Sequence, residues 1–290
     1  MRPQFSVVIP TFRRPGALAN CLGGLAVQQG QADACEVIVV DDAGDGETEQ
    51  VVQSFASRLN VRAIAPSHGG PARARNAGAA LAEGRYLAFT DDDCVPDTAW
   101  LQQMAAAIRG REPAAVGGRT VNGLLHCSLA SATQLVVDYA CYRGLTSPGH
   151  FFPANNLVVP REPFLAMGGF DESFAMYGED REFCDRWQRL GFRLDYAPEA
   201  IVRHLHPLDF PAFWQLHVNY GRGSYLFHAL RARQLGGGIR FAPPRWYAGL
   251  IAHPLGQPDG APHNARMALL VAIAQLANVT GFFWERQRMR

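Results

Sequence analysis

Short apolar runs alternate with helix-length amphipathic segments over the first 90 residues of the chain. Four of the runs predict β-strands, at residues 5–9, 36–40, 61–65 and 85–90. Three of the segments predict helices, at residues 16–29, 51–59 and 72–82. Strands that alternate with helices of this length predict an α/β fold, in which a mostly parallel sheet is flanked by helices on both faces.

Polar residues stand at the ends of three of the predicted strands. The carboxyl ends of parallel strands meet at one edge of a sheet, which is where open α/β sheets bind ligands. Taken alone, each group is also typical of a turn or a helix cap, but together they predict one site. The three groups are Pro10-Thr11-Phe12-Arg13-Arg14, Asp41-Asp42 and Asp91-Asp92-Asp93.

The three adjacent aspartates Asp91, Asp92 and Asp93 directly follow an apolar strand. Like charges at the end of a buried strand are unfavourable unless a cation neutralises them. Mg²⁺ and Mn²⁺ prefer oxygen ligands, and Mg²⁺ is typically held by one or two carboxylates together with substrate phosphates. The cluster therefore predicts a divalent cation and a substrate that contains phosphate.

The composition narrows the class of partner and the compartment. The net charge is +1, from 27 basic residues, all arginine, and 26 acidic residues, which argues against nucleic acid as the main partner. The six cysteines show no C-x-x-C spacing, so free thiols in a reducing compartment are expected. The N-terminus shows no signal-peptide pattern, and we expect a cytoplasmic protein.

Five segments, taken together and in order, resemble the family 2 glycosyltransferases of the GT-A fold. They are VVIPTFRRP, VIVVDDAG, GGPARARNAG, FTDDDCVPDTAWL and GGFDESFAMYGEDREFCDRW, and the resemblance covers about residues 5–225. It implies a Rossmann-related sheet and an inverting transfer of sugar from a nucleotide diphosphate sugar to an acceptor hydroxyl. UDP is the usual nucleotide of the family.

The resemblance also implies roles for individual residues. Asp93 matches the main metal ligand, with Asp91 and His204 as further candidates, for Mn²⁺ or Mg²⁺. Asp180 matches the general base that takes the proton of the acceptor hydroxyl. The residues that match nucleotide contacts are Pro10, Thr11, Arg13, Asp42, Arg75, Asp91 and Asp92.

Glu179 and Asp180 stand in the first turn of a predicted helix that Gly191 ends. Acidic residues in this position often only complement the helix dipole. We prefer that interpretation for Glu179 and the role of base for Asp180.

Further candidates are weaker. A histidine near a strand end is more often a hydrogen-bonded structural residue than a ligand, and only the resemblance places His204 above His206. Asn155, Asn156, Trp100 and Glu179 are candidates for the sugar and acceptor side, although a tryptophan at a helical position is more often part of the core.

The C-terminal part departs from the α/β pattern. We expect a nucleotide-sugar-binding half at 1–120, an acceptor-binding half with the base at 121–209, and a helical extension at 210–290. Residues 267–284 form an apolar stretch with a basic tail, interrupted by Gln275, Asn278 and Thr280. This is more typical of an interfacial helix at the inner face of the membrane, or of a helix packed on the domain or a second copy, than of a transmembrane span.

The acceptor class stays open between a saccharide, a lipid-linked molecule and a small molecule. Two other function classes are also open. A nucleotidyltransferase usually has a glycine-rich loop with a lysine near its N-terminus, and residues 10–16 contain one glycine and no lysine. A non-catalytic nucleotide-sugar binding protein would have no use for Asp180.

Overall fold

The computed structural model describes residues 3–29, 35–44, 46–110, 113–142, 150–174, 177–239, 241–257 and 261–290. The chain forms two compact units. The first comprises Met1–Gly123, Phe151–Ala175 and Asp180–Leu205, and the second comprises Leu124–His150, Met176–Glu179 and His206–Arg290.

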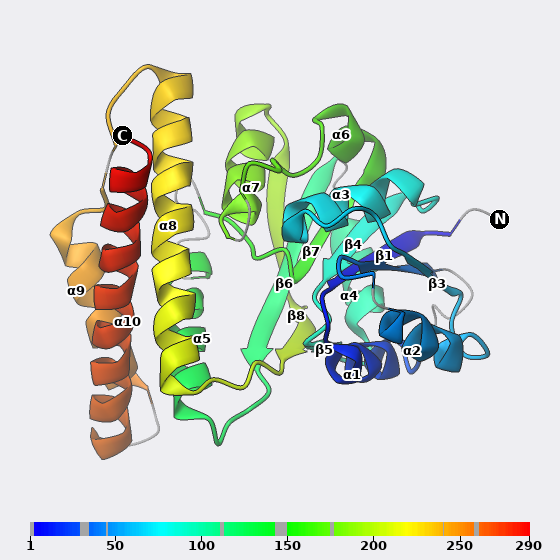
Figure 1. Cartoon of the computed structure of the whole chain (residues 1–290), viewed down its shortest axis with the longest axis horizontal. Helices are drawn as coiled ribbons and strands as arrows, with labels where there is room; N and C mark the ends of the chain where they lie inside the picture. The colour runs from blue at the N-terminus through cyan, green and yellow to red at the C-terminus, as the bar shows by residue number, and fades with distance from the viewer. Residues whose placement is uncertain are drawn as a thin grey trace. The chain divides into compact units, whose positions relative to one another are not determined.

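One sheet with the strand order β3-β2-β1-β4-β7-β6-β8-β5 forms the centre of the first unit (Figure 1). β1 pairs in parallel with β2 and β4, β2 with β3, and β6 with β8, whereas β4–β7, β6–β7 and β5–β8 are antiparallel. The mostly parallel α/β sheet is therefore confirmed. The strands are β1 (Phe5–Thr11), β2 (Cys35–Asp41), β3 (Val61–Ile64), β4 (Tyr86–Thr90), β5 (Cys94–Pro96), β6 (Ala114–Asn122), β7 (Asn156–Pro160) and β8 (Arg193–His204).

Helices cover both faces of the sheet, because β1 and its neighbours are apolar on both sides (Figure 1). Phe5, Val7 and Ile9 join a core cluster with side chains of α1 and α4. On the other face Val8 meets α3, where a Cβ at Gly78 would lie 2.5 Å from Val8, so only glycine allows this approach. The helices are α1 (Pro15–Leu25), α2 (Glu47–Phe55), α3 (Gly70–Leu81), α4 (Trp100–Ile108), α6 (Arg161–Ala166) and α7 (Glu179–Arg189).

Four phenylalanines fix α6 and α7 on the α3 side of the sheet. Phe89 of β4 packs against Phe164 and Phe170 at centroid distances of 5.2 and 5.1 Å, and Phe183 of α7 lies 5.1 Å from Phe170. Such tilted and edge-to-face ring pairs are favourable beyond the area they bury. This packing holds the first turn of α7 near the end of β4.

β8 is longer than predicted. The sequence favours a strand only at residues 193–197, because Pro198 interrupts the apolar run, but the observed strand continues to His204. Its register against β6 shifts, since Gly118 pairs with Ala197 and Arg119 pairs with Ile201. Residues 198–200 are therefore accommodated as a bulge, and His204 ends the strand instead of following it.

The second unit contains α5 (Ser128–Cys141), α8 (Phe210–Leu235), α9 (Pro244–Ala252) and α10 (Ala261–Arg288). The predicted helical character of the C-terminal extension is confirmed, and α8 is its first helix. The Asp209 side chain caps it by accepting a hydrogen bond from the Ala212 N–H at 2.8 Å, and Gly236 ends it in the left-handed conformation. The expected boundaries at 120/121 and 209/210 do not coincide with the units, because α5 packs with the C-terminal helices.

We predict that Gly117→Ala destabilises the protein. A Cβ at Gly117 would lie 1.9 Å from the ring of the fully buried Phe152, so the substitution overpacks the core and should lower the free energy of unfolding by about 1–3 kcal/mol. Gly23→Ala in α1 is the matched control, since no atom lies within 4 Å of the added methyl, and it should be neutral or stabilising by up to about 1 kcal/mol. Urea denaturation measures both, and equal midpoints for the two variants would contradict the prediction.

Candidate active site

The ends of β1, β2 and β4 lie together, as predicted. The Thr11 hydroxyl at the end of β1 donates a hydrogen bond of 2.6 Å to the Asp92 carboxylate that follows β4. The Asp42 backbone N–H, after β2, donates to the Thr11 carbonyl at 2.9 Å. The three polar groups therefore form one acidic edge of the sheet.

Asp92 is fully buried and interacts with the loop that follows β1. Its Oδ2 accepts hydrogen bonds from the Thr11 hydroxyl and from Arg14 Nε at 3.1 Å, and its Oδ1 forms an ion pair with Arg14 Nη2 at 2.5 Å. Burial raises the pKa of Asp92 to about 6, while Arg14 and Thr11 oppose this rise. With no exposed surface, the carboxylate is placed to hold the β1 loop, so the predicted nucleotide contact of Asp92 is revised to a positioning role.

Arg14 bridges two of the three aspartates, although the nucleotide contact was predicted for its neighbour Arg13. Besides Asp92, its Nη1 donates to Asp93 at 2.8 Å. The predicted residue, Arg13, is exposed, adopts a φ of 54° and lies over the ring of Phe12. Both arginines follow the same strand, so only the backbone geometry of the loop distinguishes the one that turns toward the aspartates.

Arg75 of α3 neutralises the first aspartate of the cluster. Its Nη2 lies 2.6 Å from Asp91 Oδ1, and its guanidinium stacks over the ring of Phe170 at 5.8 Å. Arg75 is only 4% exposed, whereas the Asp91 side chain keeps 26% of its surface accessible. Asp91 is therefore the most exposed of the three aspartates and the best placed to meet a ligand.

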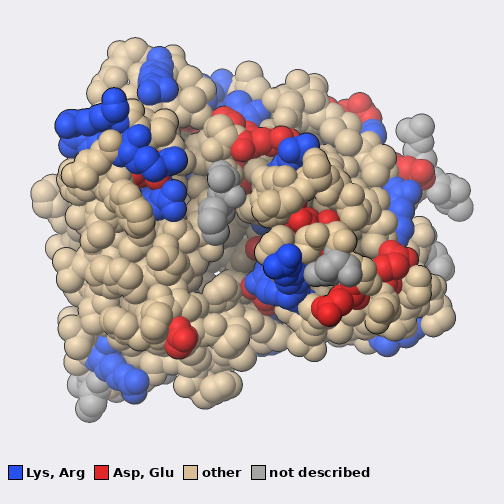
Figure 2. All heavy atoms as spheres, viewed as in Figure 1, with Lys and Arg blue, Asp and Glu red and all other residues tan. Residues whose placement is uncertain are grey.

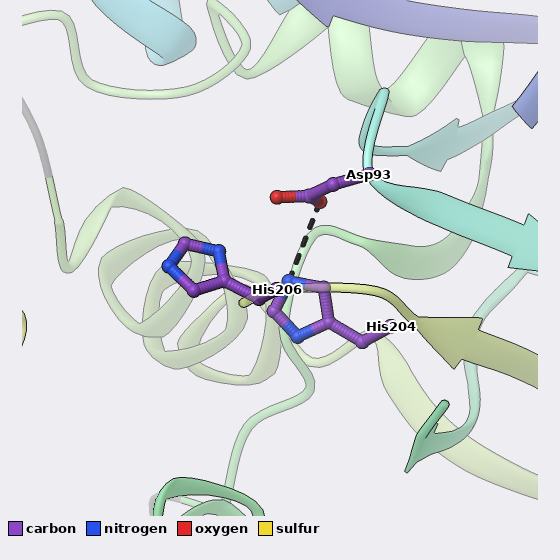
Figure 3. Close-up of side chains that lie close together, drawn as sticks. All are labelled: Asp93, His204 and His206. Atoms are coloured by element: carbon purple, nitrogen blue, oxygen red, sulfur yellow. Dashed lines mark ion pairs between the residues drawn. The ribbon is translucent and has the colours of Figure 1, made fainter. Parts of the chain in front are cut away.

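Asp93 faces the end of β8 (Figure 3). His204 Nε2 lies 3.3 Å from Asp93 Oδ1, and the Leu205 N–H donates to the Asp93 carbonyl at 2.7 Å. Burial acts to lower the pKa of His204, but the hydrogen bond and charge of Asp93 outweigh it and raise the pKa above its usual value. A carboxylate beside an imidazole is a donor pair that suits a divalent cation.

Asp42 organises the loop that leads into α3. Its two carboxylate oxygens accept the backbone N–H groups of Gly69 and Gly70 at 2.9 and 3.0 Å, and His68 Nδ1 lies 2.8 Å from Oδ2. The ring of His68 packs in turn on Phe12 at 5.1 Å. His68 stands in a loop of glycine and proline, and no motif in the sequence distinguishes it.

Asp180 occupies the first turn of α7, as predicted, and is half-buried. Burial raises its pKa, while hydrogen bonds from the Arg181 and Ala154 backbones and the charge of Arg75 act to lower it. The Arg181 N–H donates to its carboxylate at 2.7 Å. Arg75 therefore influences Asp180 electrostatically while it pairs with Asp91, which brings the predicted base into the neighbourhood of the acidic edge.

Two of the predicted acceptor residues are core residues instead. Trp100 and Asn156 are fully buried, and Trp100 Nε1 donates to Asn156 Oδ1 at 2.8 Å. Asn156 Nδ2 then donates to the Ala200 carbonyl in the bulge of β8 at 3.0 Å. Their predicted sugar contacts are wrong because these polar groups satisfy one another inside the protein.

The other two acceptor candidates differ in their surroundings. Asn155 is half-buried and accepts a hydrogen bond from the Thr120 hydroxyl at 3.0 Å. Glu179 is 5% exposed, which fits the expectation that it has a structural role at the start of α7.

Comparison with known proteins finds similar sequences and similar folds among glycosyltransferases. Residues 6–144 match the model of glycosyl transferase family 2, and residues 91–284 match that of glycosyl transferase family group 2. Among solved structures, mannosyltransferase PcManGT from Pyrobaculum calidifontis, in complex with GDP-Man and Mn²⁺, is similar with a TM-score of 0.62 and 20% identity over 100% of this chain and 85% of that one. S. aureus TarS 1–349 in complex with UDP gives a TM-score of 0.55 and 18% identity, over 99% and 91%.

Curated relatives agree with this assignment. Validoxylamine A glucosyltransferase of Streptomyces hygroscopicus subsp. jinggangensis is 31% identical over 68% of this chain and 54% of its own length. Glycosyltransferase AglE of Haloferax volcanii is 30% identical over 70% of this chain and 67% of its own length. The chain thus spans about half the length of the first of these relatives.

The fold is that of the GT-A glycosyltransferases. The chain belongs to glycosyltransferase family 2.

Asp92 predicts a pH dependence of stability. Its folded-state pKa of about 6 exceeds its ordinary value of 3.8, so the folded state binds the proton more tightly and this group lowers stability as the pH rises from 4 to 6. In Asp92→Asn this contribution is absent, so the stability of the variant relative to the parent should improve by about 2 kcal/mol between pH 4 and pH 7. Urea unfolding of both proteins in a chelator measures the change, and a difference that is the same at both pH values would contradict it.

Proposed function

We propose that this chain transfers a sugar from a nucleotide diphosphate sugar, with UDP as the nucleotide, to an acceptor hydroxyl, with inversion at the anomeric carbon. The observation that supports this most is the placement of Asp180. A half-buried carboxylate with a raised pKa lies within electrostatic reach of Arg75 and Asp91 at the acidic edge. A donor site at Asp91 and Asp93, and a base at Asp180, are what direct displacement requires.

The donor side would use the residues around the ends of β1 and β2. A backbone hydrogen bond joins Asp42 to Thr11, and Pro10 precedes Thr11 in the buried strand β1. We propose that the nucleotide lies against Pro10, Thr11, Arg13, Asp42, Arg75 and Asp91. A complex with UDP and a complex with GDP-Man among the structural neighbours support a nucleotide-linked donor.

The residues present fit a divalent cation. Asp93 and His204 place an oxygen and a nitrogen donor side by side, and the exposed part of Asp91 offers a further oxygen. We propose that these three residues hold Mn²⁺ or Mg²⁺, with His206 following His204 by two positions as an additional candidate. When bound, such an ion neutralises the charge that develops on the departing diphosphate.

Asp180 would act on the acceptor. Its carboxylate accepts the proton of the acceptor hydroxyl as that oxygen forms a bond to the anomeric carbon and the bond to the diphosphate breaks. Burial makes the carboxylate a stronger proton acceptor than an exposed aspartate, while hydrogen bonds from the Arg181 and Ala154 backbones and the charge of Arg75 act against this shift. A single displacement of this kind converts an α-linked donor into a β-glycoside.

The acceptor is proposed to be a saccharide, a lipid-linked molecule or a small molecule, with Asn155 as the remaining candidate contact. We propose that the reaction takes place in the cytoplasm. Free thiols at all six cysteines support a reducing compartment.

The base assignment predicts the effect of Asp180→Asn. The variant should lose about 10²–10⁴-fold in kcat because a positioned general base contributes this much, while binding of UDP and Mn²⁺ should stay within a factor of about three. In the parent, kcat/KM should rise with pH through the raised pKa of Asp180. Glu179→Gln is the control in the same helical turn and should keep most of the activity. Transfer by Asp180→Asn at the parent rate would exclude Asp180 as the base.

The cation assignment predicts a coupled ligand effect. UDP should raise the melting temperature by several degrees more with Mn²⁺ than without it, because a ligand at 100 times its Kd stabilises by about 2.7 kcal/mol. Asp93→Asn should remove most of the Mn²⁺-dependent part. A UDP shift that does not respond to Mn²⁺ in the parent protein would overturn the cation site, and an absent UDP shift would overturn the donor nucleotide.

A further inference from the structure

The near-neutral net charge of the chain conceals two oppositely charged units. By sequence, the second unit contains ten arginines and five acidic residues, a net charge of +5, whereas the first contains seventeen arginines and twenty-one acidic residues, a net charge of −4. Such an asymmetry between parts of one chain indicates an anionic partner for the basic part.

α10 in the second unit has two apolar faces, and only one of them is covered. Met267, Val271 and Ala274 are buried in the cluster formed with α5, α8 and α9. On the other side a stripe of leucines and phenylalanine recurs at intervals of seven residues, with Leu269, Leu276 and Phe283 exposed by 62%, 63% and 45%. Val279 and Trp284, exposed by 51% and 55%, widen this stripe.

The helix is attached to its unit and is therefore placed to lie on a surface, not to cross a membrane. The helix His263–Arg288 is long and apolar enough to cross a membrane, but 39% of its apolar 18-residue stretch is buried inside the protein. Close to its end the fully buried Glu285 pairs with Arg222 of α8 at 2.8 Å and with Arg288. Gly221 and Gly281 bring the backbones of α8 and α10 into contact. A helix held in this way keeps its inner face in protein.

Arginines gather at the C-terminal ends of α8 and α10. Figure 2 shows a mostly uncharged surface over these helices, with basic side chains at the end where the C-terminus lies. The residues concerned are Arg231, Arg233, Arg286, Arg288 and Arg290. Arg222 and Arg286 also stack on the rings of Trp284 and Phe283, so that cations and aromatic side chains alternate there.

We propose that the exposed stripe of α10 rests on an anionic lipid surface, with its apolar side chains at the boundary between headgroups and acyl chains and its arginines on lipid phosphates. An amphipathic helix with Trp, Phe and Leu beside arginines binds such surfaces through both contributions. A second copy would bring another unit of charge +5 to the same face, so charge complementarity favours the lipid over a homodimer. This proposal deepens the expected peripheral membrane contact and does not depend on sugar transfer.

Vesicle binding of the full chain tests the proposal. Co-sedimentation uses vesicles of phosphatidylcholine with about 30% phosphatidylglycerol, compared with phosphatidylcholine alone, at low and high salt. Binding should require the anionic lipid and weaken with salt. Arg286→Gln with Arg290→Gln should lower the partition coefficient about 25-fold, since each arginine near the surface contributes about fivefold. Leu276→Ser with Phe283→Ser should lower it at least tenfold.

Two controls distinguish a loss of lipid contact by α10 from misfolding of the variants. Leu190→Ser removes a leucine of similar exposure, 58%, from the first unit and should leave binding unchanged. Tryptophan fluorescence should shift to the blue on anionic vesicles, and Trp284→Phe should remove this shift.

Binding that is equal with and without the anionic lipid, or unaffected by both double variants, would overturn the proposal. A dimer in light scattering that Leu276→Ser dissociates would also overturn it, because a second copy would then cover the stripe.

Discussion

Three adjacent carboxylates at the end of a buried strand are tolerated because each one has a basic partner. Asp91 pairs with Arg75 of α3, Asp92 with Arg14 of the β1 loop, and Asp93 with both Arg14 and His204 of β8. These partners come from three separate parts of the chain, so neutralising the cluster also draws them together. The acidic edge therefore holds α3, the β1 loop and the end of β8 together, and it is also the candidate donor site of the first unit.

Periodicity and residue chemistry predicted the sheet, its helices and the edge at which polar residues meet, because these depend on local pattern and on parallel topology. The predictions that failed concern the direction in which individual side chains point. Arg13 and Arg14 are equivalent in sequence, yet only Arg14 turns toward the aspartates. Trp100 and Asn156 have polar groups that could contact a sugar, but these groups form a hydrogen bond with each other in the core. The last part of β8 was not predicted because Pro198 interrupts its apolar pattern.

Burial raises the pKa of two aspartates in this unit with different consequences. Asp92 is completely enclosed by Thr11 and Arg14, so its raised pKa appears as a sensitivity of folding to pH. Asp180 is half-buried and keeps access to the surface, so the same physical effect would make it a stronger proton acceptor in the proposed reaction. Exposure, more than the size of the shift, separates a structural from a reactive carboxylate here.

The bulge in β8 influences the face of the sheet on which the His204 side chain lies. Side chains of a strand alternate between its two faces, so the number of residues between the pairing with β6 and the end of the strand decides the side on which the histidine emerges. Asn156 holds the bulge at the Ala200 carbonyl, and Cys94 pairs with His204 beside Asp93. Residues 198–200 have no partner on β6, so loss of one of them either shortens the bulge or shifts the register, and a shift by one residue turns the imidazole to the opposite face of the sheet.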